Sequence, residues 1–259
     1  MRQGVPVFTY HKIAEPPPAT RDPFLYVSPV RFDEQLAGLR RAGCVSACLG
    51  EAFREPGQRS SKRSPEATAL AKVGPAAGGQ PQAVVLTFDD GCRNVLEHGL
   101  DILARHRFSA IQFLVAGFLG KRNEWDIVKG DVAEALMDEG QIREWLNAGH
   151  EIGSHSMTHR NLRHLSPADA REEIFGSKKS LEDRFGVPVQ HFCYPYGSWN
   201  EEVRDLVREA GYFTACTVCF GVNIRSTPPY ELRRIIPLST AELLRKMRHR
   251  LARRMGGGR

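Results

Sequence analysis

The chain has 259 residues, of which 41% are hydrophobic and 25% are charged. These values are ordinary for a globular protein that buries a full core in one α/β domain or in two small ones. No run of about 18 apolar residues occurs, which argues against a membrane-spanning helix, and residues 1–18 lack the apolar centre of a cleaved signal peptide. We therefore expect a cytoplasmic location, with the cell envelope as the alternative if the native start differs.

The net charge of +6 is concentrated at the C-terminal end. Residues 240–259 hold seven of the 36 Lys/Arg and one of the 30 Asp/Glu, which leaves 29 basic and 29 acidic residues elsewhere. A neutral body argues against nucleic acid as a partner. We expect residues 239–259 to form a basic helical tail that is solvated; weak contact with a membrane surface is the alternative. Residues 1–238 are expected to form the main domain.

Strand-like and helix-like segments alternate along the chain. The first strand is predicted at 6–11, and Ser28 with Pro29 is typical of a helix start. Residues 55–82 are rich in Pro, Gly, Ser and Ala, which favours a flexible insert. The later strands are predicted at 83–88, 109–116, 150–155, 189–196, 212–218 and 233–238, and the later helices at 94–106, 139–148, 167–185 and 200–210. Repeated β-then-α units favour a parallel sheet, open or closed into a barrel.

Reactive side chains follow four of these strands. His11 ends the first strand, Asp89-Asp90 follows VVLTF, His155 follows EIGS, and Tyr194-Pro195-Tyr196 follows HFC. Because the carboxyl ends of parallel strands gather on one face, we expect the four groups to form one site.

Two histidines in GSHSMTHRNL, His155 and His159, are four residues apart. On a helical turn this spacing points both imidazoles in one direction, although such a pair alone is more often a surface feature. With Asp90 they form a set of two histidines and one carboxylate that suits Zn²⁺, or another divalent transition metal such as Co²⁺ or Ni²⁺. Asp89 then stays free to act as a general base toward a water that the cation acidifies.

Three motifs, in this order, resemble those of the NodB-homology polysaccharide deacetylases, carbohydrate esterase family four. They are TFDDG at 87–91, H-S-x-x-H at 155–159 and YPYG at 194–197. The opening TYHKI and the later VSP before a helix resemble the branch that includes the poly-N-acetylglucosamine deacetylases. The similarity extends from about Val5 to Leu238.

The resemblance implies a single distorted (β/α)7 barrel. It also implies a metal-dependent hydrolase that removes N-acetyl groups from an amino-sugar polysaccharide, oligosaccharide or lipid-linked glycan. Asp89 corresponds to the family's base, and Tyr196 would offer its backbone N–H to the oxyanion of the tetrahedral intermediate. Ser156 would brace the histidine loop. The implied metal ligands are Asp90, His155 and His159.

The chain departs from the family pattern at two positions. Many members begin the third motif with an arginine that hydrogen-bonds the base, whereas this chain has Cys193 there. Arg234 is the candidate replacement, with a surface arginine as the alternative. The C-terminal motif that supplies a general acid is not evident, and the one later histidine, His249, lies in the basic tail. His11 is the candidate acid or orienting partner, with a structural histidine as the alternative.

Two alternative functions remain open from the sequence. One keeps the metal site but changes the substrate to a non-glycan amide or a cyclic imide. The other is a non-catalytic glycan-binding module. Among the aromatic residues, Tyr10, Tyr196 and Trp199 could stack on sugar rings, although packing is the default for such side chains. We expect the six cysteines to be reduced thiols, mostly buried.

Overall fold

The computed structural model describes residues 4–53 and 82–237. The predicted insert at 55–82 therefore lies outside the described residues, apart from Gln82, which begins a strand. The predicted tail at 239–259, with His249, lies outside them as well. In the described part of the chain, no helix combines the length and the apolar character that a membrane span requires.

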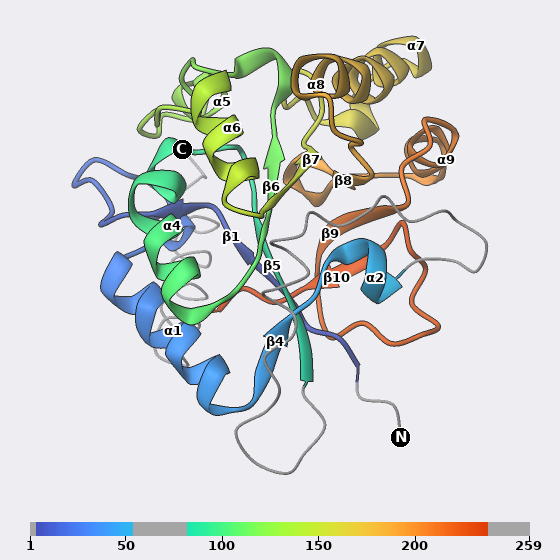
Figure 1. The fold of residues 1–259 in the computed structure, drawn as a ribbon. Helices are drawn as coiled ribbons and strands as arrows, with labels where there is room; N and C mark the ends of the chain where they lie inside the picture. Colours follow the sequence, from blue (N-terminus) through green and yellow to red (C-terminus); the bar gives the residue numbers. More distant parts are fainter. Residues whose placement is uncertain (1–3, 54–81, 238–259) are drawn as a thin grey trace, which may run out of the picture.

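A parallel sheet at the centre of the fold bends into a nearly closed barrel (Figure 1). Seven strands follow one another in the order β1-β5-β6-β7-β8-β9-β10, and β4 pairs with the first part of β5. Ile235 closes the ring, because its N–H donates to the Val7 carbonyl at 2.8 Å and its carbonyl accepts the Thr9 N–H at 2.9 Å. The predicted distorted (β/α)7 barrel is confirmed. The strands are β1 Val7–Tyr10, β4 Cys44–Ser46, β5 Gln82–Phe88, β6 Ile111–Leu114, β7 Glu151–Ser154, β8 His191–Cys193, β9 Thr214–Phe220 and β10 Leu232–Arg234.

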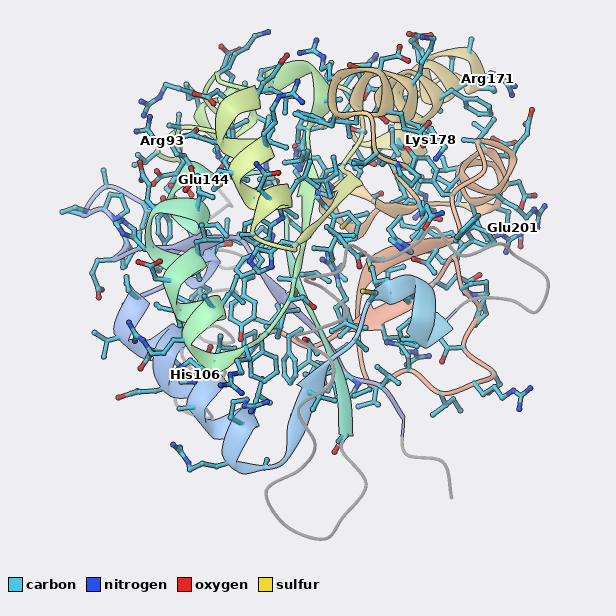
Figure 2. All side chains as sticks on the ribbon, viewed as in Figure 1. Arg93, His106, Glu144, Arg171, Lys178 and Glu201 are labelled. Carbon is cyan, nitrogen blue, oxygen red and sulfur yellow. The ribbon has the colours of Figure 1, made fainter. Side chains whose placement is uncertain are left out.

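Helices surround the sheet, and the polar side chains labelled in Figure 2 project from them. Two of the predicted helix starts are confirmed by their caps: the Ser28 hydroxyl accepts the Arg31 N–H, and the Ser166 hydroxyl accepts the Asp169 N–H. Such caps satisfy N–H groups that have no partner within the helix. The helices are α1 Pro29–Arg41, α2 Leu49–Phe53, α4 Arg93–His106, α5 Glu124–Val128, α6 Glu139–Asn147, α7 Pro167–Arg171, α8 Ser177–Phe185 and α9 Glu201–Glu209.

The structure corrects the sequence expectations at two places. The last strand, predicted at 233–238, is β10 and ends at Arg234; Ile235 makes only an isolated bridge, and Pro237 cannot donate to a ladder. The helix predicted at 167–185 is interrupted by a π-helical turn, Glu172–Gly176. Several short elements were not predicted, because two to five residues carry little periodicity: β2 Lys12–Ile13, β3 Tyr26–Val27, β4, α2 and α5.

The barrel interior is filled by side chains from alternate positions of the strands. Val85 of β5 and Leu232 of β10 belong to this interior cluster, and Cys193 and Cys216 face each other across β8 and β9. In β5 the inward row continues through Thr87 to Asp89, because strand side chains alternate between faces. In β10, the same alternation directs the side chains of Leu232 and Arg234 into the barrel. The top of the barrel interior is therefore polar, and its lower part is apolar.

His150 gives the fold a dependence on pH. Its side chain is buried against Trp145, and its Nδ1 accepts the Ala110 N–H at 3.3 Å. Burial lowers the pKa of His150 from 6.5 to about 4, so the folded chain holds it neutral. The stability that this provides is complete above pH 6.5 and is lost as the pH falls toward 4.

We therefore expect His150→Gln, which keeps a hydrogen-bond acceptor, to reduce the dependence of the unfolding free energy on pH below 6.5. Between pH 6.5 and 4 the wild type should lose roughly 1–3 kcal/mol more unfolding free energy than the variant. Thermal or urea unfolding at a series of pH values measures this difference. The exposed His164→Gln serves as the control. Equal slopes in the wild type and His150→Gln would contradict the assignment.

Candidate active site

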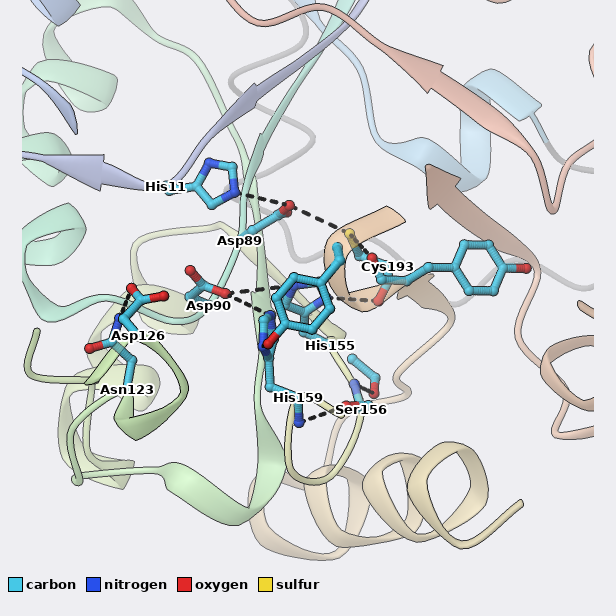
Figure 3. A network of polar contacts seen from close by, with 12 residues as sticks. His11, Asp89, Asp90, Asn123, Asp126, His155, Ser156, His159 and Cys193 are labelled. Atoms are coloured by element: carbon cyan, nitrogen blue, oxygen red, sulfur yellow. Dashed lines mark hydrogen bonds and ion pairs between the residues drawn. The ribbon is translucent and has the colours of Figure 1, made fainter. Parts of the chain in front are cut away.

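The predicted site residues come from five strand ends on one face of the barrel. Figure 3 shows the part of this site around Asp89, Asp90 and His155. His11 follows β1, Asp89 and Asp90 follow β5, and His155 follows β7. Tyr196 lies in the turn after β8, and Arg234 is the last residue of β10. All these strands are parallel, so their carboxyl ends share one face, as expected from the sequence.

Asp90 and the two histidines converge on a common point. The Asp90 Oδ1 atom lies 3.6 Å from His155 Nε2 and 3.3 Å from His159 Nε2. All three side chains are buried, and their ligand atoms lie within 4.8 Å of one another. Asp90 reaches this position from a backbone with φ of 74°, a left-handed conformation that a non-glycine residue adopts at a cost.

The segment between the two histidines is not the helical turn that was considered from their spacing. Ser156 and His159 both have left-handed backbones, with φ of 67° and 61°, and the segment is a loop. The Ser156 hydroxyl accepts the His159 N–H at 3.0 Å and fixes the turn. Four-residue spacing thus brings the imidazoles together through a tight loop instead of a helix.

Glu173 anchors the same loop from the π-helical turn and was not identified from the sequence. Its buried carboxylate accepts the N–H groups of Met157 at 3.0 Å and Thr158 at 2.8 Å, together with the Thr158 hydroxyl. A π-turn shifts the helix register by one residue and changes the direction of the side chains that follow. Such turns are frequent at functional sites. The only sequence signal was an acidic residue beside the apolar face of the predicted helix.

Hydrogen bonds and ring contacts fix the orientation of both imidazoles. His155 Nδ1 lies 2.7 Å from the Cys193 carbonyl, an acceptor, so this nitrogen carries the proton and Nε2 is left with its lone pair toward Asp90. His159 Nδ1 lies 3.1 Å from the Tyr196 hydroxyl. Trp125, which gave no signal in the sequence, stacks on the His159 ring with centroids 4.4 Å apart.

Asp89 is held by Arg234 in a buried two-bond pair. Arg234 Nη1 donates to Asp89 Oδ1 and Nη2 donates to Oδ2, both at 2.7 Å. Arg234 Nε also donates to the Thr217 carbonyl at 2.8 Å. Burial by itself raises the pKa of Asp89, but Arg234, aided by His155 and His11, lowers it to about 2. Asp89 is thus ionised at neutral pH, and Arg234 is not a surface residue.

His11 and Cys193 lie beside the same carboxylate. His11 Nε2 is 3.7 Å from Asp89 Oδ2, and the Cys193 thiol is 3.6 Å from the same oxygen. Burial lowers the pKa of His11 although Asp89 and Asp90 raise it, so His11 is neutral near pH 7. Burial raises the pKa of the Cys193 thiol well above its ordinary value. Cys193 therefore stays protonated at this distance from the carboxylate.

The residues present fit a divalent cation at Asp90, His155 and His159. Burial lowers the pKa of His155 to about 4, which leaves the neutral imidazole that ligation requires. Burial acts to raise the pKa of Asp90, but His159 and the other nearby histidines lower it far below 3.8, so it is anionic. Asp89, His155 and Cys193 also lie close enough to share an ion. That second set fits less well, because its thiol is protonated and its carboxylate is already paired with Arg234.

The aromatic residues considered from the sequence divide between packing and the site. Tyr10 is a core residue, stacked on Phe88 and packed edge-on against Phe32. Tyr196 is 41% exposed at the site, and Lys129 Nζ lies over its ring, 4.2 Å from the centroid. Trp199 lies beyond this turn and stacks on Tyr194.

A sequence profile for the family described as polysaccharide deacetylase matches residues 77–215, more than half of the chain. The chain therefore belongs to the polysaccharide deacetylase family, the NodB-homology class whose motifs it carries.

Among curated relatives, it is 26% identical over 154 residues to the putative polysaccharide deacetylase YxkH of Bacillus subtilis, covering 60% of this chain and 51% of that protein. It is 29% identical over 141 residues to a chitooligosaccharide deacetylase of Sinorhizobium fredii, covering 53% of this chain and 57% of that protein. The chain thus spans about half the length of these relatives.

Solved structures of similar fold include the deacetylase PplD of Streptococcus pyogenes in complex with acetate. That match has a TM-score of 0.68 at 21% identity and covers 95% of this chain and 99% of the other. The structure of IcaB from Ammonifex degensii matches with a TM-score of 0.67 at 19% identity, covering 95% and 96% of the two chains. At these identities the likeness establishes the fold.

Proposed function

We propose that this chain hydrolyses N-acetyl groups on the amino sugars of a polysaccharide, an oligosaccharide or a lipid-linked glycan, with a divalent metal as cofactor. The observation that carries the proposal is that two adjacent carboxylates have different partners. Asp90 is directed at two oriented imidazoles, and Asp89 is paired with Arg234. Family membership and relatives named as chitooligosaccharide deacetylases support the glycan substrate.

Asp90, His155 and His159 would hold the cation, with Zn²⁺ the best match to the donor set and Co²⁺ or Ni²⁺ as alternatives. When bound, such a cation supplies Lewis-acid polarisation of the acetyl carbonyl and acidification of water. The chain's own contribution is the orientation of the ligands by Cys193, Ser156 and Glu173.

In this proposal, Asp89 and His11 transfer the protons. Asp89 takes a proton from the attacking water, the new C–O bond forms, and the backbone N–H of Tyr196 stabilises the oxyanion. The C–N bond then breaks as the leaving amine nitrogen gains a proton, and acetate departs. His11 lies 3.7 Å from Asp89 and is neutral at rest. It therefore has to receive the proton before passing it to the amine.

The direct test is acetate detection on a panel of N-acetylated oligosaccharides, with the purified chain, with chelator, and after resupply of Zn²⁺, Co²⁺ or Ni²⁺. We expect acetate release that chelator stops and metal restores. Ring opening of a cyclic imide, measured in parallel, tests the alternative substrate class. Metal binding without turnover on any member of the panel would overturn the proposal in favour of a non-catalytic glycan-binding module.

Tyr196→Phe should weaken metal affinity about 10–100-fold, because it removes the hydroxyl that orients His159 while keeping the ring and the backbone N–H. Competition with a chromophoric chelator measures the affinity. Acetate release should fall at limiting metal and recover in excess metal. The control is Tyr230→Phe, which removes a buried hydroxyl bonded to the Tyr212 carbonyl. Unchanged affinity in Tyr196→Phe would refute the orienting role of the hydroxyl.

A further inference from the structure

A buried ion pair between Lys12 and Asp126 is not used by the proposed reaction. The two residues are 1% and 6% exposed, and Lys12 Nζ lies 3.2 Å from Asp126 Oδ2. Lys12 follows the candidate acid His11 directly, whereas Asp126 lies in α5, 114 residues away from Lys12. Removal of two charges from water costs free energy that their attraction returns only in part. Stability alone therefore does not explain a pair at this position.

The carboxylate of Asp126 holds α5 in place. This helix has only five residues, and a helix of that length does not persist in water by itself. Asp126 accepts hydrogen bonds from Lys12 and from the Asn123 side-chain amide, the latter at 2.6 Å and drawn in Figure 3, and its Oδ1 lies 3.5 Å from Lys129 Nζ. Asn123 precedes the helix and Lys129 follows it. One buried carboxylate thus connects both ends of α5 to Lys12 in β2.

Two side chains of this segment contact the group around His159. Trp125, the neighbour of Asp126, stacks on the His159 ring with an angle of 23° between the two planes. Lys129 Nζ lies over the Tyr196 ring, and the Tyr196 hydroxyl lies 3.1 Å from His159 Nδ1. The imidazole is therefore held directly by Trp125 and, through Tyr196, by Lys129. Both contacts depend on the position of α5.

We infer that Asp126, held by Lys12, is a positioning residue that fixes α5 against His159 and Tyr196 and thereby sets the metal affinity of the site. The inference rests on the proposed function in one respect, because it takes His159 as a metal ligand. Replacement of residues that orient a ligand typically lowers metal affinity 10–100-fold.

The direction of the effect separates positioning from a simple effect of charge. By charge alone, removal of a nearby ammonium group should strengthen the binding of a cation, and removal of a nearby carboxylate should weaken it. Positioning predicts weaker binding in both cases, because each change breaks the same ion pair. We therefore expect Lys12→Met and Asp126→Asn each to lower metal affinity about tenfold, measured by competition with a chromophoric chelator.

Lys129 provides variants that do not remove a buried charge. It is exposed, so Lys129→Met should fold even if Lys12→Met does not. We expect Lys129→Met to lower metal affinity about two- to fivefold, the size of an exposed contact between a cation and a ring. Lys129→Arg keeps a cation over Tyr196 and should stay close to the wild type.

Asp131→Asn is the matched control on the same segment. The Asp131 carboxylate accepts bonds from the Thr20 hydroxyl and from the N–H groups of Arg21 and Asp22, at 2.8–3.0 Å. Its replacement should lower stability in denaturant unfolding and leave metal affinity unchanged. A metal-free measurement is the indole N–H resonance of Trp125, assigned with Trp125→Phe. It should shift in Asp126→Asn and stay in place in Asp131→Asn.

The outcomes distinguish positioning from the proposed function. Stronger metal binding in Lys12→Met or Lys129→Met, or an equal loss in Asp131→Asn, overturns the positioning role. If the wild type releases acetate and Asp126→Asn keeps its metal affinity, the function stands and the positioning role fails. If the wild type binds metal without releasing acetate, the function fails, and weaker binding in Lys12→Met and Asp126→Asn still supports positioning. A wild type that binds no divalent metal overturns both.

Discussion

Asp89→Asn should reduce acetate release by about 10²–10⁴-fold while metal affinity stays close to that of the wild type. The amide cannot accept the proton that the carboxylate takes, and general-base catalysis contributes a factor of this size. Asp90, His155 and His159 keep their positions, because their mutual contacts do not involve Asp89. Acetate detection with saturating metal, together with metal titration, measures both quantities. Full activity in Asp89→Asn would overturn its assignment as the base.

This substitution also leaves the buried Arg234 guanidinium without its counter-charge, so stability must be measured alongside activity. Loss of one partner of a buried ion pair costs about 3–5 kcal/mol. The double variant Asp89→Asn, Arg234→Met should regain part of the lost stability and remain inactive. Recovery of folding without activity separates the chemical role of Asp89 from its structural role. Asp183→Asn, on an exposed helical surface, controls for removal of a carboxylate.

Arg234→Met should lower the unfolding free energy by about 3–5 kcal/mol at pH 7, because the Asp89 carboxylate is then buried without a cation. In the wild type, Arg234 holds the pKa of Asp89 at about 2, below its ordinary 3.8. The resulting stability is present above pH 3.8 and is lost as the pH falls through 2. In the variant, burial raises this pKa, and protonation relieves the cost.

The difference between wild type and Arg234→Met should therefore be largest at neutral pH and should shrink as the pH falls through the raised pKa of Asp89 in the variant and on toward 2. Denaturant unfolding at pH 7 and pH 4 measures it. The neighbouring exposed Arg233→Met should change stability by no more than about 0.5 kcal/mol. A deficit that does not depend on pH would show that Arg234 acts through packing and not through its charge on Asp89.

His11, Asp89 and Asp90 could be predicted as strand-end residues because they follow recognisable apolar runs. Val84–Phe88 leads directly into Asp89 and Asp90, and a parallel arrangement requires such ends to meet. The contact between Arg234 and Asp89 was anticipated only as a candidate, since two positions 145 residues apart meet through the closure of the ring. No local pattern encodes that closure.

The residues that orient the histidines were not predictable, because they act through tertiary contacts. Trp125 lies in a five-residue helix, and Glu173 is one acidic residue within an amphipathic segment. The spacing of His155 and His159 suggested a helix, but left-handed conformations at two residues give the same convergence by another route. Helical periodicity reports which face a residue occupies and does not report local backbone twists of this kind.

The closing contact of the ring joins the two ends of the described domain, because Ile235 pairs with β1 immediately after Arg234. During synthesis, Asp89 emerges long before the arginine that neutralises it. A polypeptide that lacks β10 therefore carries the Asp89 carboxylate without the Arg234 guanidinium that pairs with it in the barrel. Under the proposed function, the base of such a polypeptide would lack the guanidinium that holds it in place.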